Sequence, residues 1–120
     1  MRDLRRAAYE REGGRCFVTG LPLGDVDAGT WEMHHRLAGQ MGGTSLDRDT
    51  LPNVIALHRH VHNLGGGGRR NVHGHPEWSR PRGWLLSAAR RQVPARVPAL
   101  HHELGWVFLL ETGGYERMAL

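Results

Sequence analysis

A single cysteine, Cys16, is the feature that most constrains how this 120-residue chain can fold. With one thiol group, an intrachain disulfide is impossible, and so is a zinc site built from four cysteines. A chain of this length has room for one domain with a modest core, because only 39% of its residues are hydrophobic. No apolar run approaches the ~20 residues that cross a bilayer, so we expect no contact with a membrane. The charged start, MRDLRRAAYEREGGR, also lacks the apolar region of a secretory signal, so a cytoplasmic protein is expected.

The charge balance favours a polyanionic partner. Sixteen basic residues stand against twelve acidic ones, which gives a net charge of +4 with neutral histidines, and all sixteen are arginine. The arginine guanidinium is always charged and can bind a phosphate through two parallel hydrogen bonds. A GC-rich genome, whose codons favour arginine over lysine, is an equally good explanation of this composition. The surface is basic under either explanation.

The apolar spacing and the chain breakers predict a small α+β domain. A helix is predicted over residues 3–12, with Asp3 as its N-cap and Gly13-Gly14 at its end. Residues 70–91 are expected to be helical only in parts, because prolines interrupt them. Short strands are predicted at 15–19, 31–35, 53–57, 105–111 and 115–118. The second and third of these should pair, and the last two should form a C-terminal β-hairpin.

The histidines are the residues most suggestive of chemistry. His34 and His35 end a predicted strand, where successive residues face opposite sides, so one imidazole can ligate a metal while its neighbour faces elsewhere. His58, His60 and His62 share one face on a strand, whereas on a helix the first and last lie one turn apart. Either arrangement brings imidazoles together, and neutral imidazole is the usual ligand of divalent transition metals. Surface histidines without a ligand are the plainer alternative for both groups.

The order of these motifs resembles the HNH endonuclease family, also called ββα-metal or His-Me finger nucleases. His34-His35, a Gly42-Gly43 pair, the strand LPNVIAL at 51–57 and then His62 are similar to the family's histidine pair, glycine-containing loop, asparagine-led strand and later histidine. The spacing of nine positions between Asn53 and His62 is the interval that the family commonly shows. This part of the resemblance lies within residues 4–90.

Both ends of the chain extend the resemblance. REGGRCFVTG at 11–20 is similar to the R-D-G-G-x-C-x-x-C-G opening of the family, and residues 102–115 are similar to the C-terminal extension of HNH proteins from bacteriophages of actinobacteria. The resemblance implies an endonuclease domain with a ββα-metal core over 1–90 and a hairpin-bearing extension over 91–120. It also implies work on phage or host DNA in the bacterial cytoplasm, with a larger DNA-processing partner.

The resemblance assigns a role to each site residue. It implies a hydrolase that cleaves DNA phosphodiester bonds with one divalent metal ion: Mg²⁺, Mn²⁺, Ni²⁺ or Zn²⁺. His34 and His62 would ligate the metal, and His35 would be the general base that takes a proton from the attacking water. Asn53 would tie down the loop that holds the histidine pair. Histidine suits the base because its pKa lies near neutrality.

Two departures from the family pattern bear on metal binding. Gly66 stands where the family often has its third ligand, so we expect His73 to take this role, with His60 as the competitor. Of the four cysteine positions of the family's zinc ribbon, one cysteine and one histidine, Cys16 and His58, remain. These are too few for a closed zinc site, so no structural zinc is expected and the cysteine should be buried.

Arginines around the proposed site could bind the DNA backbone, with a solvated surface as the alternative. The arginines that flank the site are Arg36, Arg59, Arg69, Arg70, Arg80 and Arg82. The first four are our candidate DNA contacts. Two other functions remain open: a degenerate module of the same fold that binds DNA and metal without turnover, and a secreted nuclease toxin.

Overall fold

Helix α1 (Leu4–Arg11) forms where the apolar spacing predicted it. Asp3 caps it, because one of its carboxylate oxygens accepts a hydrogen bond of 3.0 Å from the backbone N–H of Arg5. Gly13 and Gly14 follow with φ angles of +65° and +74°, a left-handed conformation that ends the helix. The structure is a computed structural model that describes residues 3–38, 48–63 and 70–119.

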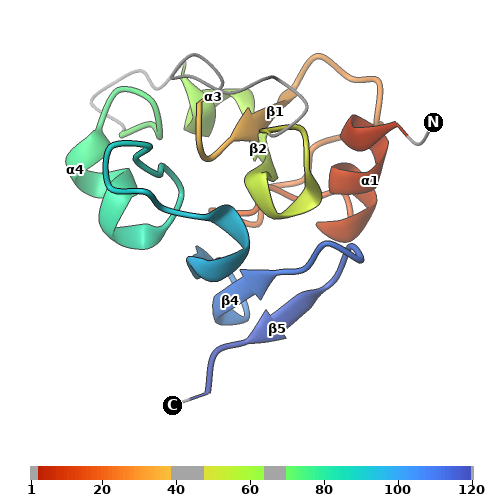
Figure 1. Ribbon diagram of the computed structural model, residues 1–120. Coiled ribbons are helices and arrows are strands. Elements are labelled where there is room, and N and C mark those ends of the chain that lie inside the picture. Colours follow the sequence, from red (N-terminus) through yellow and green to blue (C-terminus); the bar gives the residue numbers. More distant parts are fainter. Residues whose placement is uncertain (1–2, 39–47, 64–69, 120) are drawn as a thin grey trace.

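A two-stranded antiparallel sheet occupies the middle of the chain (Figure 1). Strand β1 (Trp31–His35) pairs with β2 (Val54–His58), and His34 lies opposite Ile55. This pairing confirms the predicted partnership of the two central strands. The 3-10 helix η1 (Leu51–Asn53) leads into β2, and the short helix α3 (Arg59–His62) follows it directly. Next along the chain are α4 (Pro76–Ser79), η2 (Arg80–Arg82) and η3 (Pro94–Arg96).

The C-terminal strands form a second antiparallel sheet, in the order β3-β4-β5. The predicted hairpin is β4 (Gly105–Leu109) with β5 (Tyr115–Arg117), whereas β3 (Ala99–His101) was not predicted. The architecture as a whole is the expected single α+β domain, with an N-terminal helix and C-terminal strands. No described helix is long and apolar enough to cross a membrane.

The strand predicted at 15–19 is wrong. The only strand-like pairing of this segment within the described residues is an isolated bridge between Arg15 and Pro22. The chain turns back at once, because the N–H of Gly20 bonds the Cys16 carbonyl at 2.8 Å and the Cys16 N–H bonds the Leu21 carbonyl at 2.8 Å. A reversal this tight leaves no length for five residues to pair as a strand.

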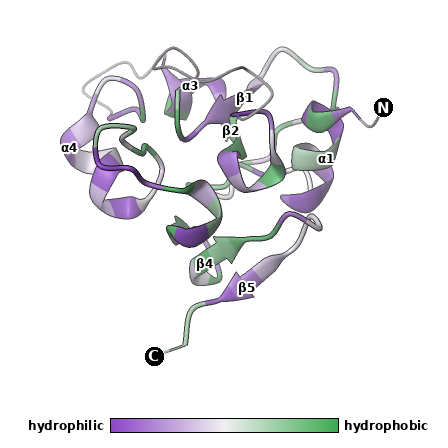
Figure 2. Cartoon of the chain, viewed as in Figure 1, coloured by the Kyte–Doolittle hydropathy of each residue, from purple (hydrophilic) through white to green (hydrophobic). Residues whose placement is uncertain are grey.

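Both sheets contribute to the same hydrophobic core. Trp31 and Ile55 of the central sheet belong to one buried cluster with Val107 and Leu109 of β4, a largely hydrophobic strand in Figure 2. Cys16 is fully buried in this cluster, as predicted. The alternation of β4 turns Trp106 outward, and it is 36% exposed.

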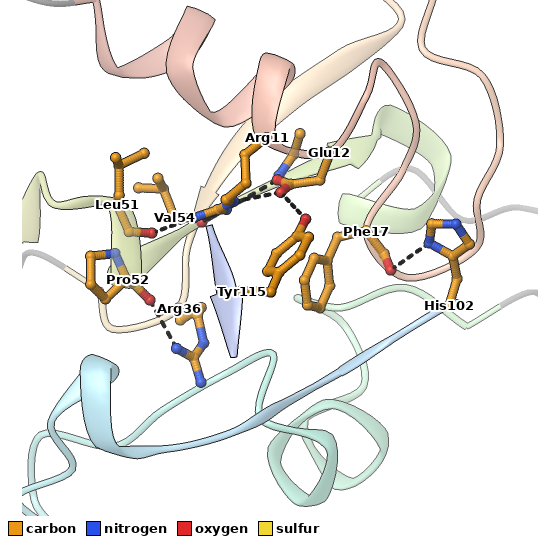
Figure 3. Close-up of polar contacts among 10 residues, drawn as sticks. Arg11, Glu12, Phe17, Arg36, Leu51, Pro52, Val54, His102 and Tyr115 are labelled. Carbon is orange, nitrogen blue, oxygen red and sulfur yellow. Dashed lines mark hydrogen bonds and ion pairs between the residues drawn. The ribbon is translucent and has the colours of Figure 1, made fainter. Parts of the chain in front are cut away.

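A buried polar network joins the N-terminal and C-terminal parts of the chain to strand β2 (Figure 3). The Tyr115 hydroxyl donates to the carboxylate of Glu12, which also pairs with Arg11 at 2.6 Å and accepts the N–H of Ala56 at 2.9 Å. The Arg11 guanidinium in turn donates to the Leu51 carbonyl at 2.7 Å. Because the buried carboxylate is both paired and hydrogen-bonded, the network fixes α1 and β5 against β2.

Candidate metal centre

The alternation of β1 sends its two histidines to opposite faces. His34 is 1% exposed and points into the protein, whereas the side chain of His35 is 32% exposed. Successive side chains of a strand point to opposite faces, so the two imidazoles cannot both ligate the same metal ion.

Three histidines from separate elements meet on the inner side. His34 comes from β1, His62 from α3 and His73 from the loop before α4, and one ring nitrogen of each lies within 4.8 Å of the others. The backbone aligns this loop with α3, because the N–H of His73 donates to the His62 carbonyl at 3.0 Å. His34 is buried, His62 is mostly buried, and His73 reaches the surface. This group could hold a metal ion.

His60, the alternative third ligand, lies outside this group. Its ring stacks on that of His58, with ring centroids 5.2 Å apart. The His73 ring instead lies 4.5 Å from His62 and 5.1 Å from His34, again between centroids. Of the two candidates, only His73 is placed with the other two expected ligands.

Hydrogen bonds on the outer side of two rings fix where their lone pairs point. His34 Nε2 lies 2.6 Å from the Trp84 carbonyl oxygen, and His62 Nδ1 lies 2.7 Å from a carboxylate oxygen of Glu32. Both oxygens accept only, so each of these nitrogens must carry the hydrogen. In the neutral rings, the lone pairs of His34 Nδ1 and His62 Nε2 then face each other across 3.1 Å.

This geometry fits a bound cation. Two lone pairs at 3.1 Å repel each other unless a proton or a cation lies between them. Two nitrogens bound to one tetrahedral zinc ion at ordinary bond lengths are about 3.3 Å apart. The inner nitrogens are therefore close to the spacing that a metal imposes, and the carboxylate and carbonyl behind them are the partners that metal-bound histidines usually have.

Burial favours the neutral form of two of the proposed ligands, His34 and His73. Burial lowers the pKa of His34 to about 3, against the opposing effect of the Trp84 carbonyl, and the nearby His62 and His73 lower it further. Burial also lowers the pKa of His73. A histidine must be neutral at the coordinating nitrogen to bind a metal, so both residues are in the required form near neutral pH.

On the other face of β1, a second cluster holds the expected general base. His35 Nε2 lies 2.7 Å from a carboxylate oxygen of Asp49. Asn53, four residues after Asp49, is fully buried. Its side chain accepts the N–H of Leu37 at 2.8 Å and donates to the carbonyls of Leu37 and Arg48, at 3.1 and 2.9 Å. It thus joins the segment after His35 to the segment that carries Asp49.

The expected DNA contact at Arg36 is wrong, because this residue is fully buried. Among the described residues its guanidinium donates only to backbone carbonyls, and Figure 3 shows one of these bonds. The acceptors, at 2.6 to 3.0 Å, are the carbonyl oxygens of Pro52, Gly83, Pro94 and Val97. Burial lowers the pKa of Arg36 to about 9, yet no surface remains for a phosphate. Its role is structural.

The other three candidate arginines differ in placement. Arg59 is exposed on α3, and its guanidinium lies 3.5 Å from the Gly29 carbonyl. Arg70 is exposed and lies over the Trp78 ring, 5.0 Å from its centroid. Arg69 lies outside the described residues, as do the glycine pair at 42–43 and the glycine run at 65–68. Arg59 and Arg70 remain available to a polyanion.

Two residues of the site were not predicted. Glu32 stands two positions before His34 on a predicted strand, so the strand period alone places both side chains on one face. That signal could have identified it as a partner of the metal ligands. Asp49 had no comparable signal, because its position opposite His35 depends on how the intervening loop returns.

No family model matches this chain, and no curated protein or solved structure matches it. The resemblance to HNH endonucleases therefore stays a prediction. The geometry that bears on function is that of the three-histidine group and of His35 with Asp49 on the other face of β1.

Proposed function

We propose that the protein is a metal-dependent endonuclease that hydrolyses phosphodiester bonds in DNA. The observation that supports this most is the three-histidine group on the inner face of β1, with His35 partly exposed on the other face of the same strand. A single strand end thereby offers a metal site and a proton acceptor on opposite sides. In-line attack on a phosphodiester needs this separation, because nucleophile and leaving group lie on opposite sides of the phosphorus.

His34, His62 and His73 are the proposed ligands, and Glu32 orients His62 through its Nδ1 hydrogen. A bound divalent cation would act as a Lewis acid that stabilises the charge on the non-bridging and leaving oxygens. Three imidazoles without a coordinating carboxylate suit Ni²⁺ or Zn²⁺ better than Mg²⁺, which prefers oxygen ligands. Among the four metals implied by the resemblance, the donor set therefore favours Ni²⁺ and Zn²⁺.

His35 is the proposed general base. Its Nε2 hydrogen is held by Asp49, so the lone pair of the neutral ring lies on Nδ1. In the reaction, Nδ1 takes a proton from a water molecule while the water oxygen bonds to phosphorus and the bond from phosphorus to the 3′ oxygen breaks. Asp49 is a positioning residue in this scheme, because it fixes the tautomer and stabilises the imidazolium that forms.

The order of elements is also consistent with the proposal. β1, β2 and α3 occur in the order of the strands and helix of a ββα unit, with His34 and His35 on β1 and His62 on α3. Asn53 ties down the segment after the histidine pair, as the resemblance implies.

A plasmid-relaxation assay on metal-stripped protein tests the proposal. Supercoiled plasmid is incubated with the full chain after addition of Mg²⁺, Mn²⁺, Ni²⁺ or Zn²⁺ in turn. We expect nicking that depends on an added metal. Plasmid binding with no cleavage under any of the four metals would contradict the proposed activity and would favour a module that binds without turnover.

A further inference from the structure

The segment at residues 80–96 is the most basic stretch of the described chain. It contains five of the sixteen arginines and no acidic residue. Those five arginines are Arg80, Arg82, Arg90, Arg91 and Arg96. All except Arg82 are exposed, and these four side chains make no hydrogen bond or ion pair with other described residues. Unpaired cations gathered on one segment indicate a surface for an anionic partner.

The backbone of this segment is folded rather than extended. A turn closes over residues 87–92, where the Arg91 N–H donates to the Ala88 carbonyl at 2.9 Å and the Ser87 N–H donates to the Gln92 side chain at 2.7 Å. Arg91 has a φ of +55°, and it is the only non-glycine residue in the described ranges with a positive φ. Glycine is the residue that fits this conformation at low cost, so an arginine here is unfavourable for folding alone.

The same segment is attached to the candidate metal centre. The Trp84 carbonyl accepts the hydrogen of His34 Nε2 at 2.6 Å, and the Leu86 N–H donates to the Arg36 carbonyl at 2.7 Å. The buried guanidinium of Arg36 also holds the carbonyls of Gly83 and Pro94, near the two ends of the segment. The residue that follows the histidine pair therefore anchors the basic segment beside it, and Figure 1 shows the segment running from α4 toward β4.

A cleft in this segment offers several hydrogen-bond donors. Arg80 and Arg90 line a cavity of about 400 Å³ together with Ser87 and Gln92, and Glu77 forms another part of its wall. Guanidinium, hydroxyl and amide groups are the side chains that most often contact phosphate oxygens in nucleic-acid complexes.

We infer that residues 80–96 form a binding surface for the phosphate backbone of duplex DNA. This inference deepens the proposed function and rests on it for the choice of DNA as the polyanion. The exposed arginines of this surface can contact phosphates, whereas the buried Arg36 cannot. Because the segment is attached to His34 through Trp84 and to Arg36, a DNA backbone bound to it would lie beside the metal ligands. The contacts are to phosphates, so binding should be salt-dependent and insensitive to base sequence.

A charge-matched pair of variants tests the inference. The first is Arg90→Gln, Arg91→Gly and Arg96→Gln combined, in which glycine suits the left-handed position. The control is Arg6→Gln, Arg15→Gln and Arg117→Gln combined, three exposed arginines outside the segment. Each variant loses three positive charges, so their overall charge is equal. Binding of the full chain to a labelled duplex of about 20 base pairs is followed by fluorescence anisotropy in EDTA, which prevents cleavage.

We expect the first variant to bind at least about tenfold more weakly than the wild type, with a plot of log affinity against log salt that is shallower by about 2 to 3. The control should bind within about threefold of the wild type, and both should melt at or near the wild-type temperature. Equal losses in the two variants would overturn the inference, as would tighter binding of the wild type to phosphatidylserine vesicles than to the duplex.

The nicking assay separates this inference from the proposed function. Segment-dependent duplex binding without metal-dependent nicking would leave the surface in place and reject the nuclease. If the wild type nicks plasmid and the first variant binds the duplex as tightly as the wild type, the nuclease is retained and the surface is rejected.

Discussion

His34 Nδ1 and His62 Nε2 lie 3.1 Å apart, while the other nitrogen of each ring donates to an oxygen behind it. The protein therefore directs two lone pairs at one point and supplies the outer partners that hold them there. This relationship is difficult to explain as packing alone, because two facing acceptors are unfavourable without a cation or a proton between them. This relationship is the main evidence that the three-histidine group is a metal site.

Replacing His73 should weaken metal binding, whereas replacing His60 should not. His73 lies in the three-histidine group, but His60 stacks on His58 away from it. We expect His73→Ala to lower the affinity for Zn²⁺ or Ni²⁺ by about 10- to 100-fold or more. Isothermal titration calorimetry on metal-stripped protein measures this, with His60→Ala as the matched control. The assignment is wrong if the His60 variant loses as much affinity as the His73 variant.

Removing the Asn53 side chain should destabilise the fold. It is fully buried and makes three hydrogen bonds to backbone groups of Leu37 and Arg48, which would lose these partners in Asn53→Ala. The expected loss in the free energy of unfolding is about 2 to 4 kcal/mol. Urea denaturation measures it, and Asn63→Ala, at an exposed position, should stay within about 0.5 kcal/mol of the wild type. A loss at Asn53 as small as that at Asn63 would contradict the anchoring role.

Stability should fall in mild acid because of His101, which is 7% exposed. Burial lowers its pKa from 6.5 to about 4, and its Nδ1 accepts the backbone N–H groups of Glu103 and Leu104, both at 3.1 Å. The unfolded chain takes up a proton near pH 6.5, but the folded chain does so only near pH 4. The contribution to stability is therefore complete above pH 6.5 and declines as the pH falls toward 4, by about 1 to 3 kcal/mol.

The variant His101→Asn isolates this effect, because asparagine keeps an acceptor for the turn and does not titrate. Its free energy of unfolding should depend less steeply on pH than that of the wild type between pH 6.5 and 4. Chemical denaturation at several pH values makes the comparison, and identical slopes for the two proteins would rule out His101 as the source.

Local sequence signals predicted the elements that depend on local chemistry. The Asp3 cap, the glycine pair after α1 and the apolar runs of β1 and β2 each act within a few residues, and the structure has all of them. The alternation of β1 likewise separates His34 from His35. For the same reason, Glu32 was within reach of a sequence argument.

Features that depend on distant segments could not be predicted in this way. Nothing near Arg36 indicates burial, because its acceptors come from segments up to 61 residues away. The strand expected at 15–19 failed because the chain reverses at Gly20. The position of Asp49 beside His35 depends on the path of the intervening loop. In each case, tertiary contacts override a reasonable local pattern.

The most direct test of the central claim is to measure plasmid nicking and metal affinity together in His35→Ala and His34→Ala. If the inner face of β1 binds the metal and the outer face supplies the base, the His35 variant should lose nicking and keep the metal affinity of the wild type. The His34 variant should lose both. Nicking at the wild-type rate by the His35 variant, or loss of metal affinity in that variant, would contradict the division of roles between the two faces.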